Sequence, residues 1–213
     1  MENKILLLGA GGHFKSVVDT LVKIGSYSVI GYIEKEMCCE PINNVQCVGT
    51  DDDLEKLHDE GWTDAFITVG SVGDVKIRKK LYRKIKEIGF QIPVIIDETA
   101  VISPLAVIGE GTFIGKNVVI NAETKIGINS IINSSSVVEH ECIIGDFCHI
   151  SSNSTLCGNC FVDNYSHIGA GSVIKQGTKI GSNVLIGIGS VVTKDIGNNV
   201  IAYGNPCKVM KNK

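Results

Sequence analysis

Between residues 102 and 192, every sixth residue of the chain is aliphatic, without an insertion or a gap. The sixteen positions are Ile102, Ile108, Ile114, Ile120, Ile126, Ile132, Val138, Ile144, Ile150, Leu156, Val162, Ile168, Ile174, Ile180, Ile186 and Val192. A second column, two residues earlier, holds only Ala, Ser, Thr, Val or Cys from Ala100 to Ser190. Neither a helix nor an ordinary strand has a period of six, so this half of the chain must be a repeat structure.

The residue after each aliphatic indicates where the chain turns. It is Gly at seven positions: 109, 115, 127, 145, 169, 181 and 187. It is Asn at positions 121 and 133 and Asp at position 163. These residue types tolerate tight corners and positive φ. We therefore predict short flat rungs joined by corners, with three hexads closing each triangular coil. The pattern resembles the hexapeptide repeat of the left-handed parallel β-helix. Its hand opposes the usual right-handed crossover and follows from that resemblance alone.

Residues 1–96 follow a different pattern, in which short apolar runs alternate with amphipathic stretches. The sequence predicts strands over 4–8, 29–33 and 65–69, and helices over about 13–24, 51–60 and 76–88. Such alternation is typical of a small parallel sheet surrounded by helices. We therefore expect a Rossmann-like α/β domain over residues 1–96, followed by a β-helix domain with a C-terminal tail over residues 97–213.

The last predicted helix of the first domain is strongly basic. Apolar residues recur at helical spacing on its other side, at Ile77, Leu81, Ile85 and Ile88. We interpret its cations as a solvated face rather than a phosphate site. They are Lys76, Arg78, Lys79, Lys80, Arg83, Lys84 and Lys86.

Charge and cysteine content exclude several classes of protein. The formal net charge of −3 and the pI near 6.0 argue against a nucleic-acid-binding protein. The opening residues contain too short an apolar run for a signal peptide, and no later stretch is long enough to span a membrane, so a cytoplasmic protein is expected. Of the eight cysteines, Cys142, Cys148 and Cys160 fall in the small-residue column, and Cys157 with Cys160 forms a single CxxC. We interpret the cysteines as reduced structural thiols and expect no metal.

The segment Gly9-Ala10-Gly11-Gly12-His13 joins the first strand to the first helix. Such a turn presents backbone N–H groups and a helix dipole to an anion. The third glycine of the dinucleotide fingerprint is replaced by Phe14, which disfavours NAD and favours the pyrophosphate of a nucleotide sugar. Glu34 ends the second strand, where a carboxylate could accept hydrogen bonds from the hydroxyl groups of a ribose. The alternative is a tight βα turn without a ligand.

Three histidines interrupt the repeat. His140 lies between Glu139 and Glu141 at a corner, which suits a general base because a carboxylate can fix the tautomer of the imidazole. The alternative is a solvated polar corner. His149 follows half a coil later and should point away from His140, so one site could use both only across two chains. His167 follows His149 by one full coil and should stack on it. Three-histidine zinc sites occur in the carbonic-anhydrase branch of the β-helix fold that this repeat resembles, but the spacings here differ from those of that branch.

Five segments carry a resemblance to a known family. They are GAGGH at 9–13, the acid at 34, TVG at 68–70, INSSSVVEHECIIGDFCHIS at 132–151 and GNPCK at 204–208. The chain resembles the bacterial nucleotide-4-amino-sugar N-acetyltransferases of the bacillosamine and perosamine type. These lie within the wider sialic-acid O-acetyltransferase-like group of hexapeptide-repeat acyltransferases. The resemblance implies an acetyl-CoA-dependent acyltransferase of glycan biosynthesis that acts on a nucleotide-linked 4-amino sugar. UDP is the preferred nucleotide in this interpretation. It also implies a homotrimer with active sites between subunits.

The same resemblance implies roles for individual residues. His140 would be the general base, Glu141 would orient it, and Asn133 and Glu139 would line the site. His149 would contact the acetyl thioester, and the backbone N–H of Gly158 would face acetyl-CoA. Pantetheine and adenine would lie near Ala170 and Ile188, and the nucleotide sugar would be held by Gly11, Gly12, His13 and Glu34. Two departures from the family pattern are the Glu34-Lys35 pair, which blurs the identity of the nucleotide, and Cys207 after the proline.

Three other functions fit part of the pattern. O-acetylation of a sialic acid or another sugar hydroxyl would use the same base and donor. A sugar-nucleotide pyrophosphorylase also combines an α/β domain with a β-helix, but its first domain is much larger and its glycine loop contains Thr and Arg. A non-catalytic binding protein on the same scaffold would have little use for the charges around His140.

Overall fold

The computed structural model describes residues 3–37 and 40–213 and divides into two compact units. The first contains residues 1–71 and 76–95, and the second contains residues 72–75 and 96–213. Within the described residues, no helix combines the length and the apolar character needed to cross a membrane. Six cysteines are described and all are free thiols, whereas Cys38 and Cys39 lie outside the described residues.

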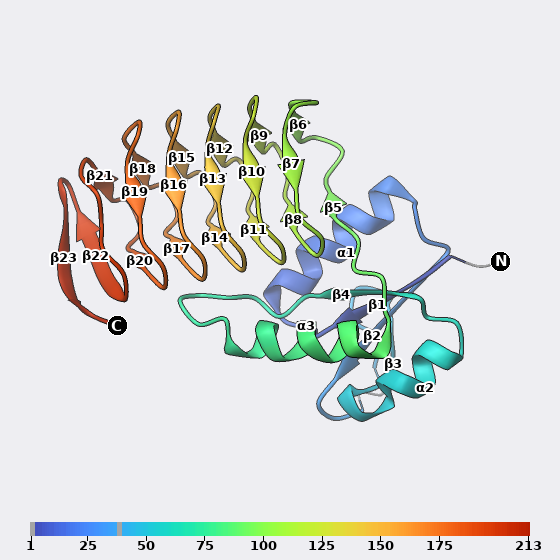
Figure 1. Cartoon of the computed structure of the whole chain (residues 1–213). Coiled ribbons are helices and arrows are strands. Elements are labelled where there is room, and N and C mark those ends of the chain that lie inside the picture. Colours follow the sequence, from blue (N-terminus) through green and yellow to red (C-terminus); the bar gives the residue numbers. More distant parts are fainter. Residues whose placement is uncertain (1–2, 38–39) are drawn as a thin grey trace. The chain divides into compact units, whose positions relative to one another are not determined.

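The first unit is built on a four-stranded parallel sheet with the strand order β3-β2-β1-β4 (Figure 1). These strands are β1 (Lys4–Leu8), β2 (Val29–Glu34), β3 (Gln46–Thr50) and β4 (Asp64–Ile67). The helices are α1 (Gly12–Ile24), α2 (Leu54–Asp59) with the 3-10 turn η1 (Asp51–Asp53) before it, and α3 (Lys76–Ile88). The predicted parallel α/β architecture is confirmed. The sequence did not predict β3, because only two of its five residues, Cys47 and Val48, are apolar.

Helix α3 is amphipathic as predicted, but two of its residues are placed differently. Arg78, assigned to the solvated face, is 1% exposed, and its Nη1 donates to the carbonyl oxygens of Ile67 and Val69 at 2.8 and 2.7 Å. Ile77, assigned to the apolar side, is 55% exposed. The exchange has a physical reason, because these carbonyls at the end of β4 need a donor that an isoleucine lacks. Burial lowers the pKa of Arg78 to about 10.

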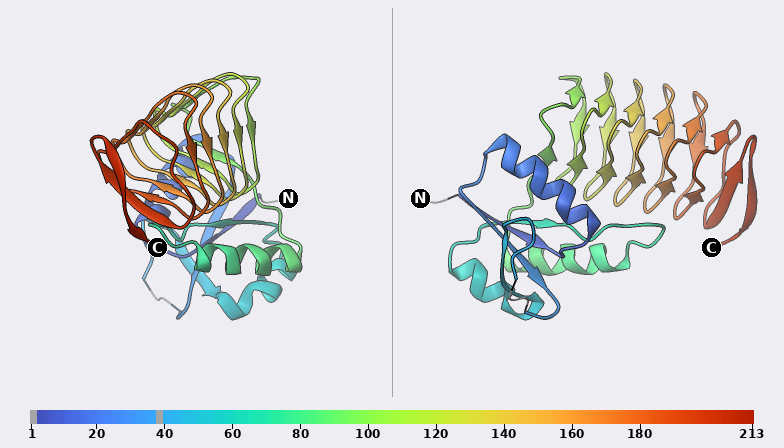
Figure 2. Two further views of the ribbon diagram at one scale, coloured as in Figure 1. Left: turned by 60° about the vertical axis from the view of Figure 1, so that its left-hand side comes forward. Right: turned by 180° about the vertical axis from the view of Figure 1, so that it is seen from behind.

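The second unit is a coil of two-residue strands stacked along one axis (Figures 1 and 2). The strands form three sheets, in the orders β19-β16-β13-β10-β7, β21-β18-β15-β12-β9-β6 and β23-β22-β20-β17-β14-β11-β8-β5. The pairing is parallel except for β23, which is antiparallel to β22. Each strand pairs with its counterpart in the next coil, as Val137 of one coil pairs with Thr155 of the next. The short strands are β5 (Ile95–Ile96), β6 (Val101–Ile102), β7 (Val107–Ile108), β8 (Phe113–Ile114), β9 (Val119–Ile120), β10 (Lys125–Ile126), β11 (Ile131–Ile132), β12 (Val137–Val138), β13 (Ile143–Ile144), β14 (His149–Ile150), β15 (Thr155–Leu156), β16 (Phe161–Val162), β17 (His167–Ile168), β18 (Val173–Ile174), β19 (Lys179–Ile180), β20 (Leu185–Ile186) and β21 (Val191–Val192). This confirms the predicted β-helix.

The two sequence columns have distinct places in the coil. The aliphatic column forms the buried core along the axis, and the small-residue column is buried beside it. Hydroxyl groups of the small column donate to a carbonyl of the following coil, as Ser154 does to Gly169 at 2.9 Å. The column cysteines do the same, and the thiol of Cys142 donates to the carbonyl of Cys157 at 3.2 Å. The predicted structural thiols are therefore also weak donors that satisfy buried carbonyl groups.

Two of the three column thiols, Cys142 and Cys148, are held in their protonated form, whereas the hydrogen bond with Cys142 lowers the pKa of Cys160 to about 7. Burial raises the pKa of Cys148 to about 12. The hydrogen bond with Cys160, together with burial, raises the pKa of Cys142 well above its ordinary value. A protonated thiol can donate its hydrogen bond at neutral pH, which fits the structural role.

The corners lie two residues later than predicted. Positive φ occurs at every sixth residue from Gly111 to Gly189, three residues after each aliphatic, and not at the glycines directly after the aliphatics. Those glycines are needed because successive coils approach closely. A Cβ on Gly109 would lie 2.7 Å from the carbonyl carbon of Gly127, and a Cβ on Gly169 would lie 2.6 Å from the nitrogen of Ile188. The glycine column therefore reflects backbone stacking and not backbone conformation.

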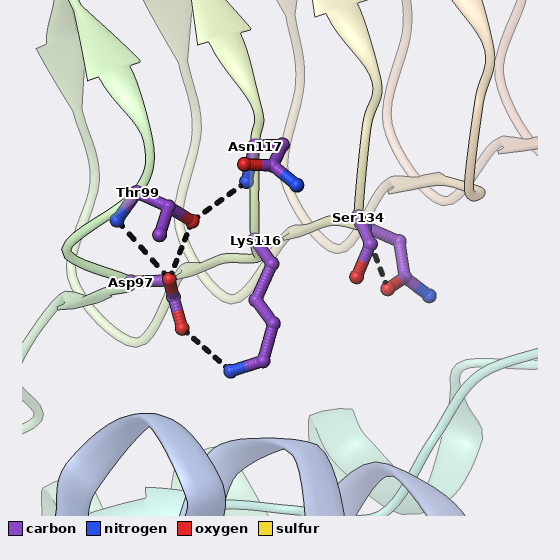
Figure 3. Close-up of polar contacts among 6 residues, drawn as sticks. Asp97, Thr99, Lys116, Asn117 and Ser134 are labelled. Carbon is purple, nitrogen blue, oxygen red and sulfur yellow. Dashed lines mark hydrogen bonds and ion pairs between the residues drawn. The ribbon is translucent and has the colours of Figure 1, made fainter. Parts of the chain in front are cut away.

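A polar cluster closes the first coil of the β-helix (Figure 3). The carboxylate of Asp97 is buried and accepts hydrogen bonds from the backbone N–H and the hydroxyl of Thr99 at 3.1 and 2.7 Å. It also pairs with Nζ of Lys116 at 2.9 Å. The hydroxyl of Thr99 in turn accepts the N–H of Asn117 at 2.9 Å. The cluster supplies partners to polar groups at the end of the stack, where a further coil would otherwise lie.

The other end is closed by an antiparallel pair, β22 (Val200–Gly204) and β23 (Cys207–Asn212). Strand β22 continues the coil by pairing in parallel with β20. The turn between β22 and β23 contains the cis peptide bond Asn205–Pro206. The GNPCK motif at 204–208 is thus the hairpin that ends the stack.

Candidate active site

The turn between β12 and β13 and the turn stacked on it one coil later form what we call the His140 corner, residues 139–141 with 158–159. His140 and Glu141 occupy the turn itself and are half-exposed, at 50% and 57% for their side chains. Nδ1 of His140 lies 2.9 Å from Oε2 of Glu141. A neutral imidazole in this contact donates from Nδ1 to the carboxylate, which leaves Nε2 as a proton acceptor. The pair therefore presents a base at the surface of the coil.

The His140 ring lies over Gly158, the equivalent position of the next coil. A Cβ on Gly158 would lie 2.6 Å from both Cε1 and Nε2 of the imidazole. The backbone of the two turns is joined by the N–H of Asn159, which donates to the carbonyl of His140 at 2.8 Å. The His140 ring can occupy this position because Gly158 has no side chain. Sequence reasoning assigned Gly158 only a backbone role, although its spacing of one full coil from His140 carried the signal.

Glu139 is tied to the preceding coil and not to His140. Its Oε2 accepts a hydrogen bond from Nδ2 of Asn121 at 2.9 Å, and its carbonyl accepts the hydroxyl of Thr124 at 2.9 Å. Asn121 is a residue that sequence reasoning missed, although it stands one full coil before Glu139. The structure brings Glu139 to the corner and fixes its carboxylate there.

Glu141 has a backbone conformation that glutamate rarely adopts. Its φ is +59°, and Glu123, one coil earlier, has φ +61°. A residue with a Cβ costs roughly 1–2 kcal/mol in this left-handed region. The repeat imposes this conformation at every corner, including those of Ser135, Phe147 and Tyr165. A glutamate at this position is therefore a costlier choice than Asn159 and Gly177, which stand one and two coils later.

Four other predicted site residues lie along a second edge of the coil. This His149 edge contains Asn133, His149, Ala170 and Ile188. Asn133 follows β11, and its Oδ1 accepts a hydrogen bond from the N–H of Ser134 at 2.8 Å. Ala170 and Ile188 occupy the exposed turns after β17 and β20, where Ile188 is 81% exposed. The His140 corner joins β12 to β13, whereas these residues belong to β11, β14, β17 and β20 or follow them. The structure therefore does not bring Asn133 or His149 beside His140 within one chain.

His149 and His167 stack as predicted. They are direct partners of β14 and β17, with ring centroids 4.7 Å apart and ring planes at 76°. Nε2 of His167 lies 3.1 Å from the hydroxyl of Ser151. In residues 3–37 and 40–213 there is no cluster of three or more His, Cys, Asp or Glu side chains placed to hold a metal ion.

The glycine loop of the first unit is open to solvent. Gly11 and Gly12 are exposed, and a Cβ on either would meet nothing within 4 Å. Gly9 has φ +95°, and a Cβ there would lie 2.6 Å from the side chain of Val69, so only glycine fits the turn. Oε1 of Glu34 accepts the N–H of Ala10 at 2.5 Å. The predicted ribose acceptor Glu34 therefore already binds the glycine loop, and His13 is the second residue of α1.

A left-handed β-helix of hexapeptide repeats with an exposed His–Glu pair on one corner defines the hexapeptide-repeat class of acyltransferases. Comparison with known proteins agrees with this. Residues 4–85 match the family model described as the PglD N-terminal domain. The acetyltransferase domain of PglB from Neisseria gonorrhoeae FA1090 is 31% identical, with a TM-score of 0.91, over 98% of this chain and 100% of that chain. The same domain was also solved with acetyl coenzyme A, with a TM-score of 0.92.

A second relative extends the comparison. PerB from Caulobacter crescentus, solved with CoA and GDP-perosamine, is 33% identical, with a TM-score of 0.87, over 98% of this chain and 97% of that chain. The chain belongs to the family of bacillosamine- and perosamine-type N-acetyltransferases.

Proposed function

We propose that this protein transfers the acetyl group of acetyl-CoA to the 4-amino group of a nucleotide-linked amino sugar, with His140 as general base. The observation that carries the proposal is the His140–Glu141 pair, with Nδ1 held at 2.9 Å and the Cε1–Nε2 edge over Gly158. The related Neisseria domain binds acetyl-CoA, and the Caulobacter enzyme binds CoA and GDP-perosamine. These ligands support the same donor and the same class of acceptor here.

The proposed chemistry is a direct transfer. Nε2 of His140 takes a proton from the sugar amine as the nitrogen forms a bond to the acetyl carbonyl carbon. The C–S bond of the thioester then breaks, and the proton on His140 passes to the departing sulfur. Glu141 holds the tautomer and stabilises the imidazolium ion. The backbone N–H of Gly158 faces the thioester, and donors of this kind typically lower such barriers by about 3–4 kcal/mol.

We further infer that the protein works as a homotrimer with its sites between subunits. The His140 corner and the His149 edge lie at different corners of one coil, so a neighbouring chain must supply one of them. The outward column of the β6 to β21 sheet supports this assembly because it is partly exposed and is apolar at every position but one. It reads Val101, Val119, Val137, Thr155, Val173 and Val191. Such a β-branched ladder suits packing against a second copy.

The nucleotide sugar is assigned to the glycine loop, through Gly11, Gly12, His13 and Glu34. The match of residues 4–85 to the PglD N-terminal domain supports a role for this unit that is shared with that family. UDP remains our preferred nucleotide, although the Caulobacter relative was solved with a GDP sugar. Because CoA thioesters and nucleotide sugars are cytoplasmic metabolites, we place the protein in the cytoplasm.

A thiol-release assay with acetyl-CoA tests the activity. The acceptors are UDP- and GDP-linked 4-amino sugars, with free and CMP-linked sialic acids as hydroxyl acceptors. We expect CoA release with one 4-amino sugar only, and release only with sialic acids would replace the proposal by O-acetylation. His140→Asn should lower kcat at least 100-fold, within the range of about 10²–10⁴ for general base catalysis. The matched control is Gln176→Ala, in the same corner column two coils later. One histidine of the Caulobacter enzyme was replaced by Ala or Asn with both ligands still bound.

Subunit mixing tests the assembly. His140→Asn and His149→Ala protomers are each expected to be inactive. In a 1:1 mixture that is unfolded and refolded together, one site in about four would combine an intact corner with an intact edge, because all interfaces in a closed ring are equivalent. Recovery of about a quarter of the wild-type activity is expected. No recovery would show that both histidines act within one chain.

A further inference from the structure

A hydrogen-bonded pair beside His149 has no role in the mechanism above. Along the outward column that contains His149, the flanking residues are apolar, with Phe113 and Ile131 before it and Leu185 after His167. Phe113 and Ile131 are 2% and 1% exposed. Two imidazoles in the middle of a largely buried apolar column cost desolvation energy that an aliphatic pair would not. Their presence therefore calls for a function.

His167 is held from two sides. Its ring packs edge-to-face on His149, at 4.7 Å between centroids, and its Nε2 lies 3.1 Å from the hydroxyl of Ser151. His167 and Ser151 are both only 8% exposed, whereas His149 is partly open to solvent. His149 is thus the more exposed of the two imidazoles, although its Nε2 is buried, and the buried ring of His167 stands beside it.

The anchor of this pair is rigid. Ser151 follows His149 by two residues on the same outward side of the coil. Its backbone N–H donates to the carbonyl of Ile168 at 2.9 Å, and its carbonyl accepts the hydroxyl of Ser136 at 2.9 Å. Because its backbone is fixed by the neighbouring coils, the Ser151 hydroxyl can fix the plane and the tautomer of His167.

We propose that His167, fixed by Ser151, is a positioning residue that sets the ring orientation of His149 toward the acyl donor. This rests on the proposed function, in which His149 contacts the acetyl thioester. A neutral imidazole has one N–H, so its contact with a thioester oxygen depends on the plane and tautomer of the ring. A partner ring packed edge-to-face, at 76° between the planes, restricts the rotation of the His149 ring that would otherwise carry the N–H away.

Two substitutions at one position separate positioning from packing. His167→Phe keeps an aromatic ring against His149 but loses the bond to Ser151, whereas His167→Gln keeps a polar group that can reach Ser151. We expect His167→Phe to lower kcat about tenfold with little change in KM for the amino sugar. His167→Gln should recover at least a third of the lost rate, and Ser151→Ala should lower kcat several-fold. A wild-type kcat in His167→Phe would overturn the proposal. Equal losses of kcat in His167→Phe and His167→Gln, together with lower melting temperatures for both variants, would also overturn it.

A second readout does not depend on any acceptor. The chain has five histidines, so protein labelled with ¹⁵N-histidine gives few imidazole signals in long-range ¹H–¹⁵N spectra. We expect one tautomer for His149 in the wild-type protein and a mixture of both in His167→Phe and Ser151→Ala. Unchanged His149 signals in these two variants would refute the positioning role. If the wild-type protein acetylates no acceptor while these shifts occur, the proposed function fails and the ring-fixing by His167 stands.

Discussion

Replacing Gly158 by alanine tests whether the position of the His140 ring controls activity. The added Cβ would lie 2.6 Å from Cε1 and Nε2, and ordinary contact begins at 3.4 Å, so the ring must retreat by about 0.8 Å. A misplacement of about 1 Å can cost on the order of 100-fold in rate. We expect kcat/KM to fall about 30- to 100-fold, which corresponds to about 2–2.7 kcal/mol of lost transition-state stabilisation.

The fold should tolerate this change. Ala122 and Gln176 occupy the equivalent corner position in other coils, and Gly158 does not have a positive φ. A Gly→Ala change at a compatible position stabilises by about 0.4–1 kcal/mol, which offsets the displacement of a half-exposed ring. The melting temperature should therefore stay within a few degrees, about 2–4 °C per kcal/mol for a domain of this size. Gly197→Ala is the matched control, because its Cβ would meet nothing within 4 Å.

The assay is CoA release at varied acetyl-CoA, with thermal melting in parallel. A double variant, His140→Ala with Gly158→Ala, separates an effect through the ring from an independent one. We expect the double variant to be as slow as His140→Ala alone. Full activity in Gly158→Ala would refute the reasoning, and so would an additional 30-fold loss in the double variant, because the ring could then not mediate the effect.

Three further substitutions test separate parts of the structure. Glu141→Asn should raise the unfolding free energy by about 1 kcal/mol, because asparagine tolerates φ +59°, while activity falls at least tenfold; a variant with unchanged melting would contradict the strain. Lys116→Met should lower stability by about 1–2 kcal/mol in urea unfolding, because Asp97 then keeps a buried charge without its ammonium partner. Hydrogen bonds from the backbone N–H and, to a lesser extent, the hydroxyl of Thr50 lower the pKa of Asp53 below 3.8. The ionised carboxylate of Asp53 therefore stabilises the folded protein above pH 3.8, and this stabilisation is lost as the pH falls through the pKa of the folded state. Asp53→Asn should therefore lower the melting temperature at pH 7 and have a smaller effect at pH 3.

Much of the β-helix could be predicted because every hexapeptide carries the same packing requirement. One aliphatic and one small residue per hexad fix the axis and the register, and sixteen repetitions leave no room for a shift. The predicted position of the corners was wrong because a glycine in the repeat can serve either of two structural purposes. At Gly109 it permits two backbones to approach, whereas at Gly111 it accommodates φ +69°. Asn117, Asn129 and Asn153 at the positive-φ position carried the better signal.

The site was less accessible to sequence reasoning because its contacts run between coils. The Asn121–Glu139 bond and the contact of His140 with Gly158 both join residues one full coil apart. Such partners are found only once the coil length is used to align the sequence with itself. Arg78 illustrates a different limit, because a helical pattern places its charge outside while two strand-end carbonyls draw it inside.

The exceptions to the repeat coincide with the residues of the proposed active site. The inward columns can vary only among aliphatic or small residues, because each coil must pack on the next. Chemistry is therefore confined to the corners and to the outward column, where side chains are not needed for stacking. At these positions, the chain places a strained glutamate, an exposed histidine and a second pair of histidines in an otherwise apolar ladder. Each raises the cost of folding without improving the stack, which supports the proposal that these residues are retained for activity.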